Sequence, residues 1–138
     1  MHIVRQTKSY DCGVAVAAMV GNVSYAAVLD RLITGLSSET TLNELVMWRT
    51  LQDITRMEWQ FVEVPPPRPR LRDWSFPETP IAVLIERADS SRHYVAVLGR
   101  FIYDPLFEEP IATQEYADGN SSVITVFAAK TPAAEPGA

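Results

Sequence analysis

Residues 12–20, with the sequence CGVAVAAMV, constrain this chain more than any other segment. Their alanines favour a helix, which Gly21 and Asn22 would end, and the helix is apolar on nearly every side. A helix without a polar face is usually buried, because it has no surface to present to water. The sequence therefore predicts a fold with this helix in the middle of the domain.

Two further helices are expected in the first half of the chain. One begins after Ser24, and its apolar residues, among them Val28, face inward. The next begins at Thr41, with Glu44 three residues later at the second position of a capping box. Between these two helices, residues 35–38 predict a turn.

The second half of the chain changes to strand-like patterns. Alternating or continuous apolar runs predict strands at residues 58–64, 80–87, 93–99, 101–105 and 121–130, and a short strand is also expected at residues 2–4. Gly99 and Arg100 suit a two-residue type II′ turn, which would join two of these strands in a hairpin. Helices followed by strands indicate an α+β fold, with N-terminal helices packed on a C-terminal antiparallel β-sheet.

Length and charge exclude several classes of protein. The chain has 138 residues, which suits a single domain over residues 1–130 and a small, proline-containing tail at 131–138. A net charge of -5 leaves no basic stripe for phosphates, so we expect no nucleic-acid partner. The longest apolar run, VAVAAMV, is far shorter than the ~20 residues that span a bilayer, so we expect no membrane span. Without the apolar core of a signal peptide, a cytoplasmic protein is expected, although signal-independent export stays open.

Cys12 is the only cysteine, and it stands where the apolar helix begins. A thiol must lose its proton before it attacks an amide, and the positive end of a helix dipole stabilises the thiolate. Asp11 is a suitable N-cap for a helix that begins there. Taken alone, such a cysteine is more often a small buried hydrophobe, so its partners decide its role.

The predicted hairpin supplies two partners for Cys12. If Gly99 and Arg100 form the turn, His93 lies diagonally opposite Asp104 on one face of the sheet, with Cα atoms ~7–8 Å apart. The carboxylate of Asp104 would then hold one ring nitrogen of His93 and leave the other for Cys12. From the residues alone, a histidine at a loop edge and an aspartate in a turn remain open alternatives.

Gln6 precedes Cys12 by six residues and fits a fourth role. Attack on a carbonyl creates an oxyanion, which needs donors already in place. The side-chain amide of Gln6 and the backbone N–H of Cys12 are the candidates, with a surface glutamine as the alternative. The only other histidine, His2, is expected at the terminal surface, and one cysteine with two histidines predicts no metal site. No phosphate-binding loop is present, and no cofactor is expected.

These motifs together resemble a known family. The residues concerned are Gln6, then Asp11, Cys12 and Gly13 with the alanine-rich helix, then His-Tyr-Val-Ala-Val from His93, and Tyr-Asp-Pro ending at Pro105. They look like the papain-like bacteriocin-processing peptidases, which are the double-glycine leader peptidase domains of peptide-exporting ABC transporters and their stand-alone relatives. The resemblance covers residues 6–105. Val14 stands where that family often has proline, and the hairpin is shorter than is usual there.

The resemblance implies a papain-like cysteine peptidase fold and a role for each motif residue. Cys12 would be the nucleophile, His93 the general base and acid, Asp104 the residue that orients it, and Gln6 the oxyanion donor.

The expected activity is cleavage of a peptide or isopeptide bond in a peptide or protein substrate. A glutamine deamidase, a transacylase or a cell-wall amidase would use the same site, and an inactive papain-like binding module is the non-enzyme alternative. The oligomeric state stays open. We expect the sulfur and the imidazole to converge in a solvent-open groove.

Overall fold

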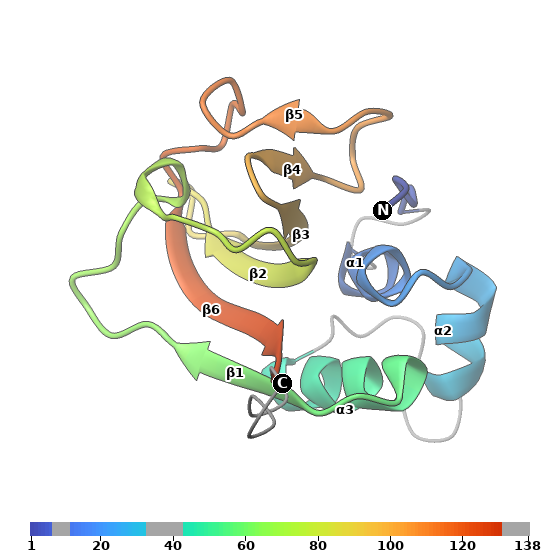
Figure 1. The fold of residues 1–138 in the computed structure, drawn as a ribbon. Helices are drawn as coiled ribbons and strands as arrows, with labels where there is room; N and C mark the ends of the chain where they lie inside the picture. Colours follow the sequence, from blue (N-terminus) through green and yellow to red (C-terminus); the bar gives the residue numbers. More distant parts are fainter. Residues whose placement is uncertain (7–11, 33–42, 131–138) are drawn as a thin grey trace, which may run out of the picture.

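The computed structural model describes residues 1–6, 12–32 and 43–130. Several predicted features lie outside the described residues: the N-cap at Asp11, the turn at 35–38, Thr41 and the tail at 131–138. Three helices come first along the chain and a six-stranded antiparallel sheet follows (Figure 1), which confirms the α+β order.

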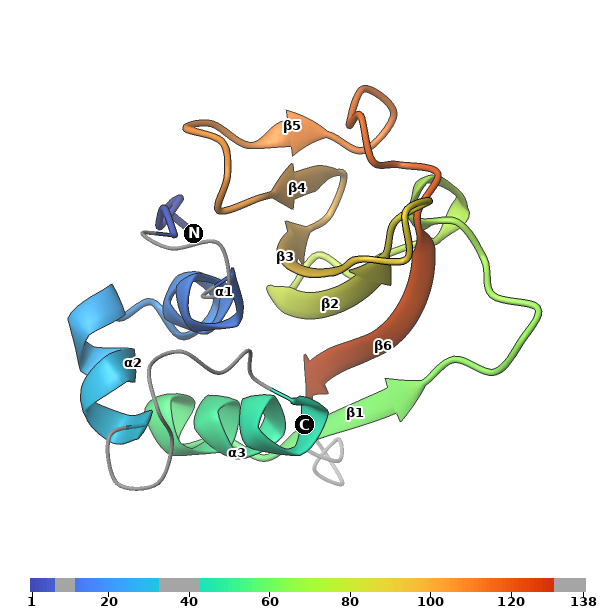
Figure 2. The ribbon, with the colours of Figure 1, turned by 180° about the vertical axis from the view of Figure 1, so that it is seen from behind.

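The helices are α1 (Cys12–Gly21), α2 (Tyr25–Leu32) and α3 (Glu44–Thr55). Every residue of α1 from Cys12 to Met19 is buried, as the apolar sequence predicts. Figures 1 and 2 show α1 between the sheet on one side and α2 and α3 on the other. The apolar helix is therefore covered from several directions.

Polar side chains fix the beginnings of the other two helices. The hydroxyl oxygen of Ser24 accepts a hydrogen bond from the Ala27 N–H at 3.1 Å, as expected at the start of α2. At α3 the predicted cap is wrong, because Asn43 rather than Thr41 takes this role and accepts from the Val46 N–H at 2.9 Å. Asparagine is as good an N-cap as threonine. Glu44 is the first residue of α3, and its carboxylate accepts a hydrogen bond from Thr125 on the sheet at 2.7 Å.

Taken singly, none of the three described helices is both long and apolar enough to cross a bilayer. Only together do α1 and α2 reach that length and composition, and a bend of 115° separates them.

The strands run in the order β1-β6-β2-β3-β4-β5 across the sheet, and every neighbouring pair is antiparallel. Their bounds are β1 Trp59–Glu63, β2 Ile81–Glu86, β3 Arg92–Leu98, β4 Phe101–Tyr103, β5 Ile111–Ala112 and β6 Ser122–Ala129. The five longer predicted strands are confirmed to within one or two residues at each end. The two-residue β5 and a short 3-10 helix (Leu71–Asp73) carry no pattern that predicts them. The strand predicted at residues 2–4 is wrong, since no strand forms there.

Apolar side chains cover both faces of the sheet, so the molecule has two cores. The first core joins α1 to buried sheet residues that include Ala82, Leu84, Tyr94, Ala96, Ile124 and Phe127. The second core, on the other face, contains Val64, Leu71, Ile81, Val83, Ile85, Val95, Val97, Ile102, Tyr116 and Val123. A sheet buried on both faces requires continuous apolar strands, which explains the sequences of β2 and β3.

The β3–β4 hairpin has the predicted register. Leu98 pairs with Phe101 and Val97 with Ile102, so Gly99 and Arg100 form a two-residue turn. Gly99 has a φ angle of 60°, the positive value that a type II′ turn needs at its first position. This register fixes which residues of the two strands share a face.

The turn makes a direct prediction for Gly99→Ala. Apart from its two chain neighbours, no described residue has an atom within 4 Å of a side-chain carbon added at Gly99, so we expect the cost to come from the positive φ. Left-handed backbone costs an L-residue roughly 1–2 kcal/mol, and we expect the free energy of unfolding to fall by about that amount in a urea titration. Arg100→Ala is the matched control, with an expected change within about 0.5 kcal/mol. Equal losses in the two variants would contradict the assignment of the turn.

Candidate active site

His93 and Asp104 form a buried, hydrogen-bonded pair at one end of the hairpin. His93 is the second residue of β3, and Asp104 directly follows β4. The Nε2 atom of His93 lies 2.8 Å from Oδ1 of Asp104. Asp104 is completely buried and His93 is 4% exposed. The contact predicted from the hairpin register is therefore confirmed.

Two further donors hold the carboxylate of Asp104. The Leu106 N–H donates to Oδ1 at 2.9 Å, and the Tyr116 hydroxyl donates to Oδ2 at 2.5 Å. Burial and the neighbouring Asp104 charge raise the pKa of Tyr116, so its hydroxyl keeps the proton that it donates. Burial alone would raise the pKa of Asp104, but the contacts with His93, Tyr116 and Leu106 outweigh it and lower that pKa. Asp104 therefore stays a carboxylate.

The sequence does not predict the part that Tyr116 plays. It stands in the polar segment QEYADGN between β5 and β6, where no periodicity marks a buried residue. An aromatic residue surrounded by polar ones is the only available signal. Its contact with Asp104 depends on the path of the loop in three dimensions.

Cys12 meets the other side of the imidazole. α1 packs against β3, and Cys12 lies near enough to His93 to contribute to its raised pKa. Because Nε2 is engaged by Asp104, Nδ1 is the ring nitrogen left for Cys12. Cys12 is the first residue of α1, so its sulfur also lies at the positive end of the helix dipole.

The Cys12–His93 contact is made where the two cores meet. Strand alternation places His93 with Val95 and Val97, which belong to the second core, whereas Cys12 belongs to the first. His93 is the second residue of β3. A residue that packs on the opposite face of the sheet can therefore approach it around the end of the strand. The site therefore lies at one end of β3, where Cys12 of the first core approaches His93.

His93 is held in its charged form. Burial disfavours the imidazolium and lowers the pKa, but the hydrogen bond and negative charge of Asp104, together with the neighbouring Cys12, outweigh it and raise the pKa of His93 to about 9. His93 therefore carries a positive charge near neutral pH.

The backbone of Gln6 brings the N-terminal segment to the same region. Its N–H donates to the carbonyl of Pro105 at 3.1 Å, one residue beyond Asp104. An ion pair between Arg5 and Glu108, at 3.5 Å, holds the segment there as well. The structure thus gathers all four predicted residues. That the side-chain amide of Gln6 serves an oxyanion stays a prediction.

The site is more enclosed than the sequence predicts. We expect a solvent-open groove, yet Cys12 and His93 are each only 4% exposed. Cys12 packs in the first core, and Ile85, which pairs with His93 across β2 and β3, is completely buried. Cys12 lies near enough to His93 to influence its pKa, and the exposed part of either residue is small.

Within residues 1–6, 12–32 and 43–130, no group of three or more His, Cys, Asp or Glu side chains is placed to hold a metal ion. No protein-family model matches this sequence, and no curated protein matches it.

The raised pKa of His93 predicts how stability changes with pH. The folded-state value of about 9 exceeds the ordinary 6.5, so the protonated imidazole stabilises the fold fully below pH 6.5. That contribution, on the order of 3 kcal/mol, is lost as the pH rises to about 9. Urea unfolding of the wild type between pH 6 and 9.5 should show the decline, and His93→Gln should flatten it. His2→Gln is the control, and a decline that persists in His93→Gln would contradict the assignment.

Tyr116→Phe tests the support of Asp104. The change removes only the hydroxyl and leaves Oδ2 of a buried carboxylate without that donor, which costs roughly 1–3 kcal/mol of unfolding free energy. Tyr103→Phe, at the last residue of β4, is the matched control and should lower the free energy of unfolding by less than about 0.5 kcal/mol. Equal unfolding free energies for Tyr116→Phe and the wild type would show that the hydroxyl does not support Asp104.

Proposed function

We propose that this chain is a papain-like cysteine hydrolase that cleaves a peptide or isopeptide bond. The observation that carries the proposal is the chain of contacts from the sulfur of Cys12 through the imidazole of His93 to the buried carboxylate of Asp104. Nucleophile, base and orienting acid in this order are the requirements of thiol-based acyl transfer.

The energetic cost of the arrangement supports a functional role. Burying charged groups costs several kcal/mol per ion unless they are paired and hydrogen-bonded. A structural core would need neither a charged imidazole nor a thiol beside it. Perturbed titratable groups of this kind cluster at functional sites, because chemistry requires them there.

The reaction follows from the positions of the ring nitrogens. In the proposed resting state the thiol proton of Cys12 has already passed to His93, so a thiolate lies beside the imidazolium that Asp104 holds at Nε2. The thiolate attacks the substrate carbonyl, and the oxyanion accepts hydrogen bonds from the Cys12 N–H and the Gln6 side-chain amide. The C–N bond breaks as His93 protonates the leaving amine. Water, deprotonated by His93, then hydrolyses the thioester and restores the thiolate and the imidazolium.

The papain-like assignment has two supports. A buried helix that begins with the nucleophile packs against an antiparallel sheet that carries the histidine. The segments at residues 6, 11–13, 93–97 and 103–105 resemble the leader peptidases in the same roles. A peptide or protein is the substrate class that suits an enzyme of this kind.

Thiol labelling tests the proposal directly. Cys12 is the only cysteine, so one added iodoacetamide adduct by intact-protein mass spectrometry reports this residue alone. The wild type should react fast near neutral pH, and His93→Ala should react at least about tenfold more slowly, because the thiolate loses its counter-charge. His2→Ala removes the only other histidine and should leave the rate unchanged.

Equal labelling rates for the wild type and His93→Ala would defeat the catalytic assignment.

Where labelling behaves as expected, incubation with peptide mixtures identifies the reaction. Hydrolysis splits a chain, whereas deamidation of a glutamine adds about one dalton without splitting it. Cys12→Ala should abolish either product.

A further inference from the structure

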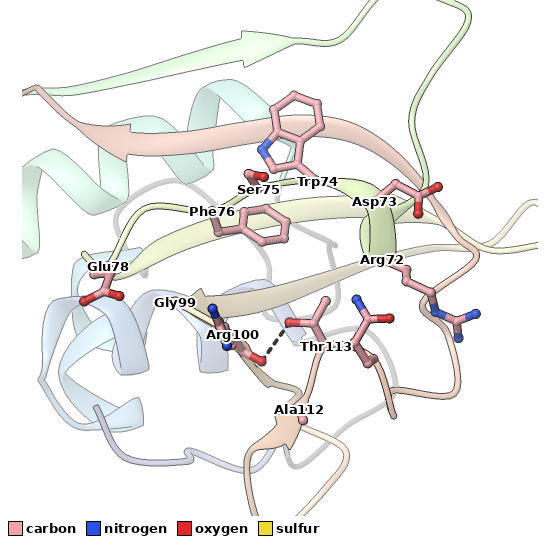
Figure 3. A pocket seen from close by; sticks show the side chains of 11 residues that line it. Arg72, Asp73, Trp74, Ser75, Phe76, Glu78, Gly99, Arg100, Ala112 and Thr113 are labelled. Atoms are coloured by element: carbon pink, nitrogen blue, oxygen red, sulfur yellow. Dashed lines mark hydrogen bonds between the residues drawn. The ribbon is translucent and has the colours of Figure 1, made fainter.

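A cavity of about 510 Å³ lies at the turn end of the β3–β4 hairpin, away from Asp104. Three segments form its wall: residues 72–78, the turn of Gly99 and Arg100, and residues 112–114 (Figure 3). This volume is within the ~300–1,000 Å³ of pockets that take small organic ligands. None of the residues proposed for catalysis lines it.

Backbone hydrogen bonds tie the three segments together. The Gly99 N–H donates to the Pro77 carbonyl at 3.2 Å. The N–H and the hydroxyl of Thr113 both donate to the Arg100 carbonyl at 2.8 Å, and Figure 3 shows the hydroxyl contact. The cavity is therefore preformed, which lowers the entropy cost of filling it.

Two arginines of the wall take part in none of the ion pairs among the described residues. Arg72 has its Nε atom buried without a hydrogen-bond partner in the described part of the chain. Arg100 is exposed, and none of the ion pairs among the described residues includes it. By contrast, Asp73 in the same wall is already paired with Arg70 at 2.8 Å. The buried Nε atom of Arg72 packs against Gly119 and is closed to a ligand, so the charge that the wall offers to an anion is the exposed guanidinium of Arg100.

The same wall carries an aromatic pair. Trp74 and Phe76 stack with ring centroids 6.3 Å apart and an angle of 30° between their planes. Both are half-buried and pack against the second core, so their positions are fixed. Fixed aromatic faces beside an exposed arginine suit a ligand that has a flat apolar part as well as a charge.

We propose that this cavity binds a small organic anion, in which a carboxylate or phosphate group is attached to a flat apolar ring. The anionic group faces Arg100, and the ring lies against Phe76 and Trp74. Glu78, the carboxylate of the wall without an ion pair among the described residues, opposes the anion. The site is separate from the Cys12 site and does not depend on its activity.

Titrations of ¹⁵N-labelled protein test the proposal, with phenyl phosphate and benzoate as the probes. Either probe should produce saturable NMR shifts at the Trp74 indole N–H and at the Gly99 and Thr113 amides. Comparison of the two probes tells phosphate from carboxylate recognition. Benzyl alcohol, with the ring alone, and inorganic phosphate, with the charge alone, should each bind at least about fivefold more weakly.

Charge variants decide which groups hold the probe. Arg100→Gln changes an exposed residue and should weaken binding of the better probe at least about fivefold. Glu78→Gln should tighten it by roughly twofold or more, because a repulsive charge is removed. Arg49→Gln, an exposed change on α3, should leave the affinity unchanged. The absence of saturable shifts with both probes would overturn the proposal, and so would an affinity that Arg100→Gln does not alter.

Discussion

A fully buried carboxylate is the constraint on which the arrangement of this molecule depends. Asp104 has no contact with water, and a carboxylate in that position costs several kcal/mol unless donors surround it. The donors come from three places: His93 on β3, the Leu106 amide of the following loop, and Tyr116 beyond β5. Satisfying one side chain therefore fixes the hairpin, the loop after β4 and the segment before β6 relative to one another.

The buried helix α1 supplies the other half of the site. Burial of its apolar residues places it against β2 and β3, and this placement holds its first residue at the end of β3. Cys12 is then brought to His93 by packing rather than by any polar contact further along the helix. The hydrophobic effect thus positions the nucleophile, while hydrogen bonds position the base. Substitutions that alter the packing of α1 would consequently displace the sulfur, and substitutions that remove a donor to Asp104 would displace the imidazole.

The sequence predicts those parts of the fold that are determined by interactions between residues close together along the chain. Gly99 fixes a two-residue turn, the turn fixes the register, and the register places His93 opposite Asp104, all within twelve residues. Three other features depend instead on how segments far apart in the sequence pack together: the position of Tyr116, the strand β5 and the enclosure of Cys12. Sequence periodicity carries no information about such packing. The cap of α3 fails for a third reason: Thr41 and Asn43 are both good N-caps, and composition cannot choose between them.

The hairpin joins the two sites described above, and its packing decides whether they act on each other. Its central residues Val95, Val97 and Ile102 are completely buried in the second core. A slip of one residue would turn each of them to the opposite face, so the hairpin has a single register under native conditions. A rigid element with one arrangement has no second state for a ligand to select. Occupancy of the cavity at Arg100 should therefore leave the geometry of His93 and Asp104 unchanged, and any coupling between the two sites would require a change outside this hairpin.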